Sequence, residues 1–399
     1  MGFCKVFFKP FQPQIYPFGV YPLKNSSNFP THPLLFMAEL VYNCPMQILG
    51  YAKRQTEDPK LRPYGALDYL LFAYVAYARF DFLHPYFPLT FEEASSHKEF
   101  KMKATYEDCF TQRSLKSLFF ALASSPRYKK AKLIAYHAES DNDKALQFAA
   151  LAIELEDELL ICFRGTSPAY IGWKEDFALS YQEDIASYYK AEEFLDYATS
   201  LCQKPLVLAG HSKGGHVAAY CLIKSKHVNR IKSAYSFEGP GFRNKSIIEG
   251  LLRDPRYMKI IPNSSFVGIL LSNEEKVKIV RSVNIGPFQH DPFSWQVKGN
   301  DFFYVSKRSQ TSKRMDLAIN NWIYSLSKEE RQRFTEILFG ALDKLKARDF
   351  LAFFRTLPAN IGPLYQEYRG LSNEDKTVFS KVVKRLVKNL MSPPKEKKN

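Results

Sequence analysis

The sequence predicts an α/β fold in which helices flank a mostly parallel central sheet. Between about residues 131 and 283, short apolar segments with strand character alternate with segments of helical periodicity. One of these apolar segments ends in a glycine-rich turn that leads directly into a helix. Strands that alternate with helices usually pair in parallel, because each helix returns the chain to the same end of the sheet.

The glycine-rich turn is the most specific feature of the chain. Residues 206–215 read LVLAGHSKGG, an apolar run that breaks into the pattern G-x-S-x-G. A strand that turns at once into a helix crowds the turn, and glycine at positions 210 and 214 removes the collision. Ser212 then projects its hydroxyl above the carboxyl end of the sheet, with the amide of Lys213 as an oxyanion donor. Such a nucleophile elbow is typical of α/β-hydrolases, whereas the simplest alternative is a tight turn with a surface serine.

The other elements follow from periodicity and from the turns between them. Residues 1–60 are rich in proline and aromatic residues, and we expect them to form an irregular N-terminal extension. Helical periodicity predicts helices over residues 67–74, 105–124 and 187–201, and residues 173–181 form a short amphipathic segment. Besides the elbow strand, strands are expected over residues 131–137, 145–153, 159–163, 233–237, 257–261 and 277–283. The run at 145–153 is also compatible with a helix.

Only helical periodicity remains after about residue 312. It predicts helices over residues 317–326, 328–344, 349–354 and 373–391. We therefore divide the chain into the extension (1–60), an α/β-hydrolase core (61–311), a helical C-terminal region or cap (312–392) and a disordered tail (393–399).

Composition limits the partners and the compartment. Lys plus Arg (56) exceed Asp plus Glu (41), for a formal charge of +15, which favours anionic lipid surfaces or nucleic acid as partners. A generally lysine-rich proteome is the alternative, and since no basic-aromatic nucleic-acid module is visible, we expect no nucleic-acid partner. The six scattered cysteines, the lack of a signal-peptide pattern and the lack of a membrane-spanning run indicate a cytoplasmic protein. No metal-ligand spacing or phosphate-binding glycine loop appears, so we expect no cofactor and no metal.

A serine nucleophile needs a base, and the chain offers few histidines after the elbow. Only His216, His227 and His290 follow Ser212, and the chain order of the fold places the histidine last. His216 lies within the elbow helix, where it packs or caps locally, and His227 lies near the end of that helix as a surface residue. His290 lies in a loop after the last strand, which is where a base can reach back over the sheet.

Five segments together resemble the class 3 lipase-like branch of the α/β-hydrolases. They are FRGT at 163–166, GWKED at 172–176, GHSKGG at 210–215, FEGPGF at 237–242 and QHDP at 289–292. The resemblance covers about residues 65–385, and it is closest to a bacterial family of lipase-like proteins. It implies a cytosolic bacterial hydrolase.

The resemblance also implies roles for individual residues. It assigns Ser212 as the nucleophile, His290 as the base and Thr166 as the second oxyanion donor. The sequence around Thr166 is consistent with this role. Thr166 ends a strand that is expected to neighbour the elbow strand, so that two backbone amides can converge. We further expect Arg164 and Asp176 to form a buried ion pair that fixes the loop around Thr166.

The acid of the triad departs from the pattern of the family. Related lipases carry an aspartate after the strand at 257–261, but this chain reads PNSS at 262–265. Glu238 is the preferred substitute, because it ends the strand after the elbow helix and can reach the histidine from there. The alternatives that stay open are Asp291 as the acid, the dipole of Ser264 or of Asn263 in place of an acid, and no acid at all.

Two functions of different classes compete. The first is an esterase or lipase-like hydrolase that acts on small-molecule or lipid esters through an acyl-enzyme on Ser212. The second is a catalytically impaired scaffold of the same fold, which binds a partner or an anionic membrane through its C-terminal helices. Residues 173–181 form either a lid or acyl-chain wall, or part of the core. No sequence feature selects an oligomeric state.

Overall fold

The computed structural model describes residues 46–103, 111–271, 276–345 and 357–391, together with Asp349 and Phe353. The described residues all lie within one compact unit, Cys44–Asn399. The predictions for residues 1–45 and for the tail at 393–399 therefore lie outside the described residues, as does most of the helix expected at 349–354.

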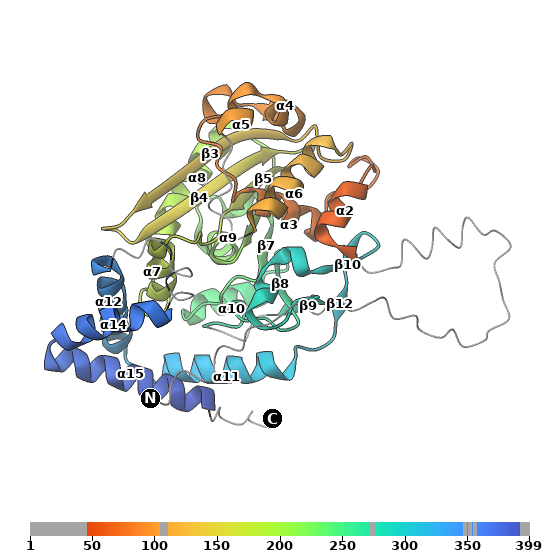
Figure 1. Cartoon of the computed structure of the whole chain (residues 1–399). Helices are drawn as coiled ribbons and strands as arrows, with labels where there is room; N and C mark the ends of the chain where they lie inside the picture. Colours follow the sequence, from red (N-terminus) through yellow and green to blue (C-terminus); the bar gives the residue numbers. More distant parts are fainter. Residues whose placement is uncertain are drawn as a thin grey trace, which may run out of the picture. The chain divides into compact units, whose positions relative to one another are not determined.

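A large central sheet organises the compact unit (Figure 1). Its strands follow the order β12-β9-β8-β7-β6-β5-β4-β3-β2. Their bounds are β2 Leu89–Thr90, β3 Lys132–Asp141, β4 Leu146–Glu154, β5 Leu159–Phe163, β6 Leu206–His211, β7 Ile231–Phe237, β8 Tyr257–Pro262, β9 Val277–Val280 and β12 Tyr304–Val305. A smaller sheet joins β1 (Met46–Gln47), β10 (Gln296–Lys298) and β11 (Asp301–Phe302).

The sheet is parallel in its centre and antiparallel at its edges. Strands β5 to β9 pair in parallel, whereas β2 to β5 and the pair β9–β12 are antiparallel. Short loops join β3 to β4 and β4 to β5, and such loops can only connect antiparallel neighbours. The prediction of an α/β fold with a mostly parallel central sheet is confirmed, and the run at 145–153 is a strand.

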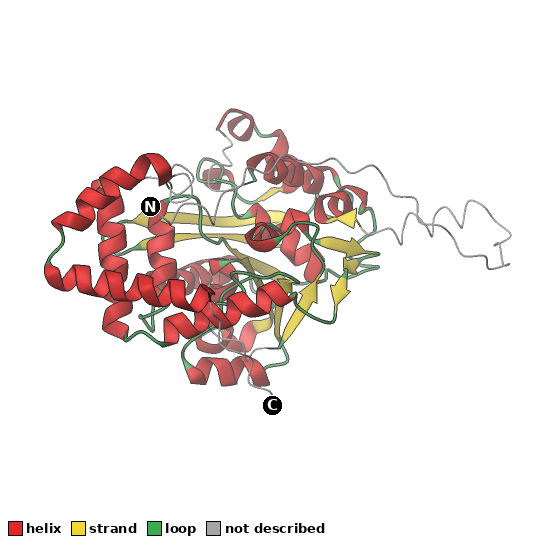
Figure 2. Ribbon diagram, turned by 60° about the horizontal axis from the view of Figure 1, so that its bottom comes forward, coloured by secondary structure: helices red, strands yellow, loops and turns green. Residues whose placement is uncertain are grey.

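Helices cover both faces of the sheet (Figure 2). On one face lie α3 (Ala66–Val75) and α6 (Gln112–Ser124), and on the other lie α8 (Ala186–Leu201), α9 (Lys213–Lys224) and α10 (Lys245–Arg253). Each face has its own hydrophobic cluster, and successive residues of a strand alternate between the two. In β6, for example, Val207 packs in one cluster and Leu208 in the other. The elbow strand is therefore buried on both faces.

The range expected to be an irregular extension contains ordered structure. Residues 46–54 form β1 and the helix α2 (Ile48–Arg54), so the expectation is wrong for this part of 1–60. Ile48, Tyr51 and Ala52 are buried in the core. Their spacing gives α2 an apolar stripe, and burial of that stripe against α6 stabilises the helix.

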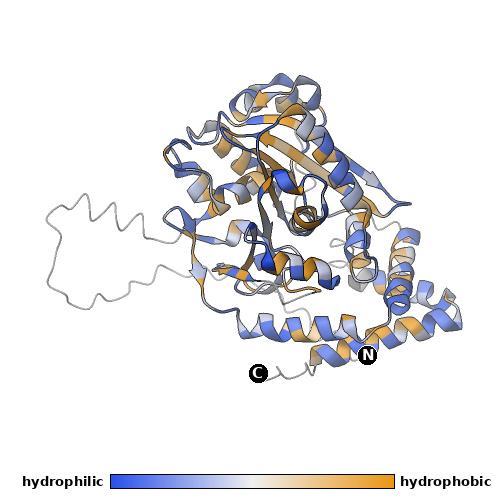
Figure 3. Cartoon of the chain, turned by 180° about the vertical axis from the view of Figure 1, so that it is seen from behind, coloured by the Kyte–Doolittle hydropathy of each residue, from blue (hydrophilic) through white to orange (hydrophobic). Residues whose placement is uncertain are grey.

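The C-terminal region is mostly helical over its described residues, as predicted. Its described helices are α11 (Gln310–Tyr324), α12 (Lys328–Lys344), α14 (Leu357–Gly370) and α15 (Asn373–Met391). Hydrophobic and hydrophilic segments alternate along them, as amphipathic helices require (Figure 3). α15 packs on α11 and α12, and α12 in turn packs on α7 (Tyr170–Ala178). None of the described helices combines the length and the apolar composition that a membrane crossing requires.

Candidate active site

The elbow has the strained geometry that its sequence predicts. Ser212 lies between β6 and α9 with φ 57° and ψ −132°, a left-handed conformation that is unfavourable for a serine. A Cβ atom at Gly210 would lie 2.1 Å from the carbonyl carbon of Gly214, and one at Gly214 would lie 2.0 Å from the carbonyl oxygen of Phe163. Only glycine fits at these two positions, so the strain on Ser212 is imposed by close packing around it.

The predicted site residues gather at the carboxyl edge of the parallel strands. Phe163 pairs with Gly210, and His211 pairs with Phe237, so the ends of β5, β6 and β7 lie side by side. A Cβ atom at Gly165 would lie 2.8 Å from the Cβ of Ser212. The loop after β5, which carries Thr166, is therefore packed directly against the serine.

Glu238 is a fully buried carboxylate held by several donors. It follows β7 with φ 53°, and its donors come from residues 265–267. The hydroxyl of Ser265 donates to it at 2.9 Å, and the backbone amides of Phe266 and Val267 donate to Oε1 at 3.1 and 3.2 Å. These donors replace the water that an ionised carboxylate loses on burial.

His290 faces this carboxylate. Its Nδ1 atom lies 3.9 Å from Oε1 of Glu238, and its ring is partly exposed while Glu238 is not. The separation is longer than a hydrogen bond, and catalytic hydrogen bonds are often long in the unliganded state. Among the described residues, no hydrogen bond joins His290 Nδ1 to any side chain, and none joins the hydroxyl of Ser212 to the His290 ring.

His211, the residue before Ser212, ties the elbow to the His290 loop. Its Nε2 lies 2.8 Å from the carbonyl oxygen of His290 and its Nδ1 lies 3.0 Å from the hydroxyl of Tyr77. Because a carbonyl only accepts, Nε2 carries the proton and Nδ1 accepts from Tyr77. Burial holds the pKa of His211 well below its usual range, so the ring is neutral. The rings of His211 and His290 lie 4.6 Å apart, which places His290 at the same edge of the sheet as Ser212.

Two backbone amides beside Ser212 have no acceptor within the described part of the chain. They belong to Thr166, in the loop after β5, and to Lys213, the first residue of α9. Unpaired N–H groups at a helix N-terminus attract negative charge, and a pair of them flanking a nucleophile can stabilise an oxyanion.

Both of these residues are anchored to α7 through their side chains. The hydroxyl of Thr166 donates to Oδ2 of Asp176 at 2.7 Å. The ammonium of Lys213 is buried, donates to the carbonyl of Gln147 at 2.7 Å and forms an ion pair with Glu175. Consecutive acidic residues of α7 therefore hold the two candidate oxyanion donors.

The buried carboxylate of Glu175 accepts hydrogen bonds from several donors. Besides Lys213, it accepts from the backbone amide of Ser187 at 2.9 Å, from the hydroxyl of the same residue at 2.7 Å and from the amide of Gln147 at 3.2 Å. The neighbouring Asp176 has fewer partners, and burial raises the pKa of its carboxyl to about 6.

The expected ion pair between Arg164 and Asp176 is corrected by this arrangement. Asp176 bonds to Thr166, and no ion pair between Arg164 and Asp176 occurs within the described residues. The carboxyl of Asp176 points toward the loop that carries Thr166, and the nearby ammonium of Lys213 partly opposes the rise in its pKa. Asp176 still supports the loop, but it does so through Thr166.

The alternative acids have other partners. Asp291 caps the short helix at Pro292–Ser294 by accepting from the amide of Phe293 at 3.1 Å. The hydroxyl of Ser264 donates to Ser309 at 2.7 Å, and Asn263 Oδ1 accepts from the amide of Ser282 at 3.2 Å. Of the candidate acids, Glu238 is the one with an ion pair to His290 in the described structure.

The other two histidines after the elbow lie away from the serine hydroxyl. His216 contacts the hydroxyl of Tyr188 at 2.5 Å and the carbonyl of Pro240 at 3.1 Å, and burial lowers its pKa to about 3. His227 bonds to Asp196 at 2.7 Å. Both observations agree with the structural roles that the sequence predicts for them.

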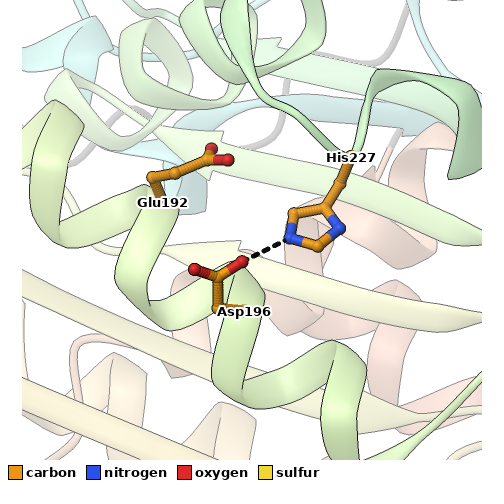
Figure 4. Close-up of side chains that lie close together, drawn as sticks. All are labelled: Glu192, Asp196 and His227. Carbon is orange, nitrogen blue, oxygen red and sulfur yellow. Dashed lines mark hydrogen bonds and ion pairs between the residues drawn. The ribbon is translucent and has the colours of Figure 1, made fainter.

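His227 belongs to a surface cluster of potential metal ligands. Glu192 and Asp196 project from α8 toward His227, which follows α9 (Figure 4). The ammonium of Lys226 lies 2.6 Å from Oδ2 of Asp196, and the amide of Lys226 donates to Glu192 at 3.1 Å. A cation of the chain already neutralises this cluster, so we assign it no metal.

The segment at 173–181 packs as core and as an interface to the C-terminal helices. Ala178, Leu179 and Tyr181 belong to the hydrophobic cluster on one face of the sheet. Phe177 packs edge-on against the buried Phe339 of α12, with ring centroids 5.4 Å apart. Of the two interpretations, the structure favours core over a free lid.

The family assignment follows from a sequence match. The Mbeg1-like family model matches residues 122–340, which is more than half of the chain and includes the elbow, Glu238 and His290. The chain belongs to the Mbeg1-like family. This family is lipase-like, so the resemblance of the five segments to lipase-like proteins is confirmed, whereas closeness to a bacterial family stays a prediction. A search of curated proteins finds no match.

Several lipase structures resemble the fold of this Mbeg1-like chain at low identity. The Lip2 lipase of Yarrowia lipolytica is 15% identical, with 46% of this chain and 74% of that chain covered and a TM-score of 0.31. The lipase of Rhizopus microsporus var. chinensis is 13% identical, with 64% and 80% covered and a TM-score of 0.34. A fungal lipase is 10% identical, with 65% and 92% covered and a TM-score of 0.37. Roles for individual residues of the Mbeg1-like chain rest on its own geometry.

Proposed function

We propose that this protein is a serine hydrolase that cleaves carboxylic esters through an acyl-enzyme on Ser212. The observation that carries the proposal is the convergence of the strained Ser212, the His290 loop and the buried Glu238 at one edge of the sheet. In the proposed reaction, His290 removes the proton of the Ser212 hydroxyl as the oxygen attacks the ester carbonyl. His290 then protonates the leaving alcohol, and water that His290 activates releases the acid.

Glu238 is the proposed acid. When His290 takes up a proton, the imidazolium needs a negative charge at Nδ1, and the carboxylate of Glu238 lies 3.9 Å from that atom. The donors from residues 265–267 keep this fully buried carboxylate in a fixed position. The aspartate that related lipases carry after β8 is therefore replaced from the neighbouring strand β7.

The amides of Thr166 and Lys213 are the proposed oxyanion hole. The carbonyl oxygen gains negative charge as the tetrahedral intermediate forms, and preorganised donors stabilise it. Because Asp176 and Glu175 anchor the two residues, neither donor has to reorganise during the reaction. The position of the Glu238 carboxylate near His290 favours the hydrolase over the scaffold alternative, which was motivated mainly by the missing acid.

Ester hydrolysis tests the proposal. The purified protein is assayed with p-nitrophenyl esters of short and long acyl chains, beside Ser212→Ala and a control, Ser200→Ala, whose serine lies on the surface of α8. We expect wild type and Ser200→Ala to hydrolyse at least one ester, and Ser212→Ala to lose activity by a factor on the order of 10⁵–10⁶. Equal activity of Ser212→Ala and wild type would overturn the proposal.

A further inference from the structure

The loop that carries His290 exposes a cluster of apolar side chains. Val283, Ile285 and Phe288 are 51%, 70% and 71% exposed, respectively. Single apolar residues on a surface need no explanation, but three large ones within six positions form a patch of the kind that marks an interaction site. We call these three residues the apolar loop cluster.

Hydrogen bonds stabilise the loop that exposes the cluster. The amide of Val283 donates to the carbonyl of Ser294 at 2.9 Å, and the side-chain amide of Asn284 donates to the carbonyl of Phe288 at 3.0 Å. Below them, the indole of Trp295 is buried and donates to the carbonyl of Gln289 at 2.8 Å. These hydrogen bonds brace the loop, so its apolar side chains are presented to solvent by a folded support.

The cluster adjoins the proposed catalytic residues. It follows β9, which runs parallel to the elbow strand, and thus begins at the same edge of the sheet as Ser212. Phe288 precedes His290 by two positions, and His290 is bonded to His211 at the elbow. Whatever binds the cluster is therefore held beside the nucleophile.

The stretch of sequence around the cluster carries more exposed basic than exposed acidic residues. Between residues 276 and 307, the exposed basic residues are Lys276, Lys278, Arg281, Lys298 and Lys307, whereas the exposed acidic residue is Asp301. Arg281 lies two positions before Val283, at the end of β9. Exposed apolar side chains with neighbouring cations are the pattern of a surface that binds anionic lipid.

We propose that the apolar loop cluster docks the protein on an anionic lipid surface. Ile285 and Phe288 insert among the acyl chains while the neighbouring cations contact the headgroups. The inference rests on the proposed function, because it makes lipid esters the substrate class of the same site. It also assigns the membrane contact to the His290 loop, whereas the sequence alone suggested the C-terminal helices.

Vesicle binding tests the proposal. The full chain is sedimented with vesicles made of equal parts of phosphatidylcholine and phosphatidylserine, and with vesicles of phosphatidylcholine alone. The test variant is Ile285→Ser/Phe288→Ser. The matched control is Leu201→Ser, because Leu201 is 50% exposed at the end of α8, beside the start of β6 and thus at the opposite edge of the sheet.

We expect wild type and Leu201→Ser to bind the mixed vesicles, more weakly at high salt, and the double variant to bind at least tenfold more weakly. Hydrolysis of a soluble short-chain ester should stay unchanged in the double variant. Equal vesicle binding by wild type and the double variant, or no binding by wild type, would overturn the proposal. So would a wild-type dimer that becomes monomeric in the double variant, because a second copy would then cover the cluster. Vesicle binding without ester hydrolysis would instead count against the proposed function alone.

Discussion

Glu238 is the residue on which the proposed mechanism departs most from the family pattern. It has a positive φ, it is fully buried and its Oε1 atom lies 3.9 Å from His290. A buried carboxylate is costly unless several donors satisfy it, and here a hydroxyl and two amides do so. An arrangement of this kind keeps a charge where the imidazolium of a base would need one.

Replacing this charge should slow the reaction without changing the fold. We expect Glu238→Gln to lower kcat for ester hydrolysis by a factor of about 10³–10⁴, because the amide cannot stabilise the imidazolium. Asp291→Asn serves as the control, since Asp291 is adjacent to His290 but caps a short helix, and it should retain most of the activity. If Glu238→Gln kept the wild-type rate, Glu238 would have no part in the mechanism.

At the scale of elements, α7 is the helix that supports the proposed oxyanion hole. Glu175 holds Lys213, and Asp176 holds Thr166. On its other side α7 contacts α12, where Phe177 meets Phe339. The C-terminal helices therefore buttress α7 and, through it, the two amides beside the nucleophile.

The buried ion pair between Lys213 and Glu175 should affect the free energy of unfolding. Lys213→Met should lower the free energy of unfolding by about 3–5 kcal/mol, because it leaves the carboxylate of Glu175 buried without its cation. The double variant Lys213→Met/Glu175→Gln should recover much of this loss, since no charge then remains unpaired. Urea denaturation measures both.

Ion pairs at the surface supply the control for the stability change in Lys213→Met. Lys190 on α8 pairs with Glu193 and with Glu139 at the surface, where solvent screens both pairs, so Lys190→Met should change the free energy of unfolding by less than about 1 kcal/mol. A loss in Lys213→Met as small as that in Lys190→Met would contradict the role given to the buried pair.

At the scale of the whole molecule, the sequence predicted the elements better than their contacts. The strand at 159–163 and the helices at 328–344 and 373–391 have the bounds expected from periodicity, because each is a strong apolar pattern between clear turns. The antiparallel edge formed by β2, β3 and β4 was not predicted, since periodicity does not tell which neighbours a strand pairs with. The helix α2 was not predicted, because its apolar stripe is short.

For the candidate site, too, the sequence predicted positions better than contacts. The positions of Ser212, Glu238 and His290 at the elbow, at the end of a strand and in a loop follow from patterns that the sequence expresses locally. The partners of Asp176 and Lys213 do not, because any of several acidic and basic residues of the loops would give a plausible pair. The role of His211 was also missed, although it adjoins Ser212, because its contacts come from residues far away in the chain.

The central claim is that His290 activates the hydroxyl of Ser212, and labelling by a fluorophosphonate probe tests it most directly. The probe forms a covalent bond with an activated serine, and mass spectrometry of peptides locates it. We predict rapid labelling at Ser212 in wild type, none in Ser212→Ala and, in His290→Asn, labelling slower by a factor on the order of 10³ or more. Labelling of Ser212 at the wild-type rate in His290→Asn, or an inert Ser212 in wild type, would contradict the account.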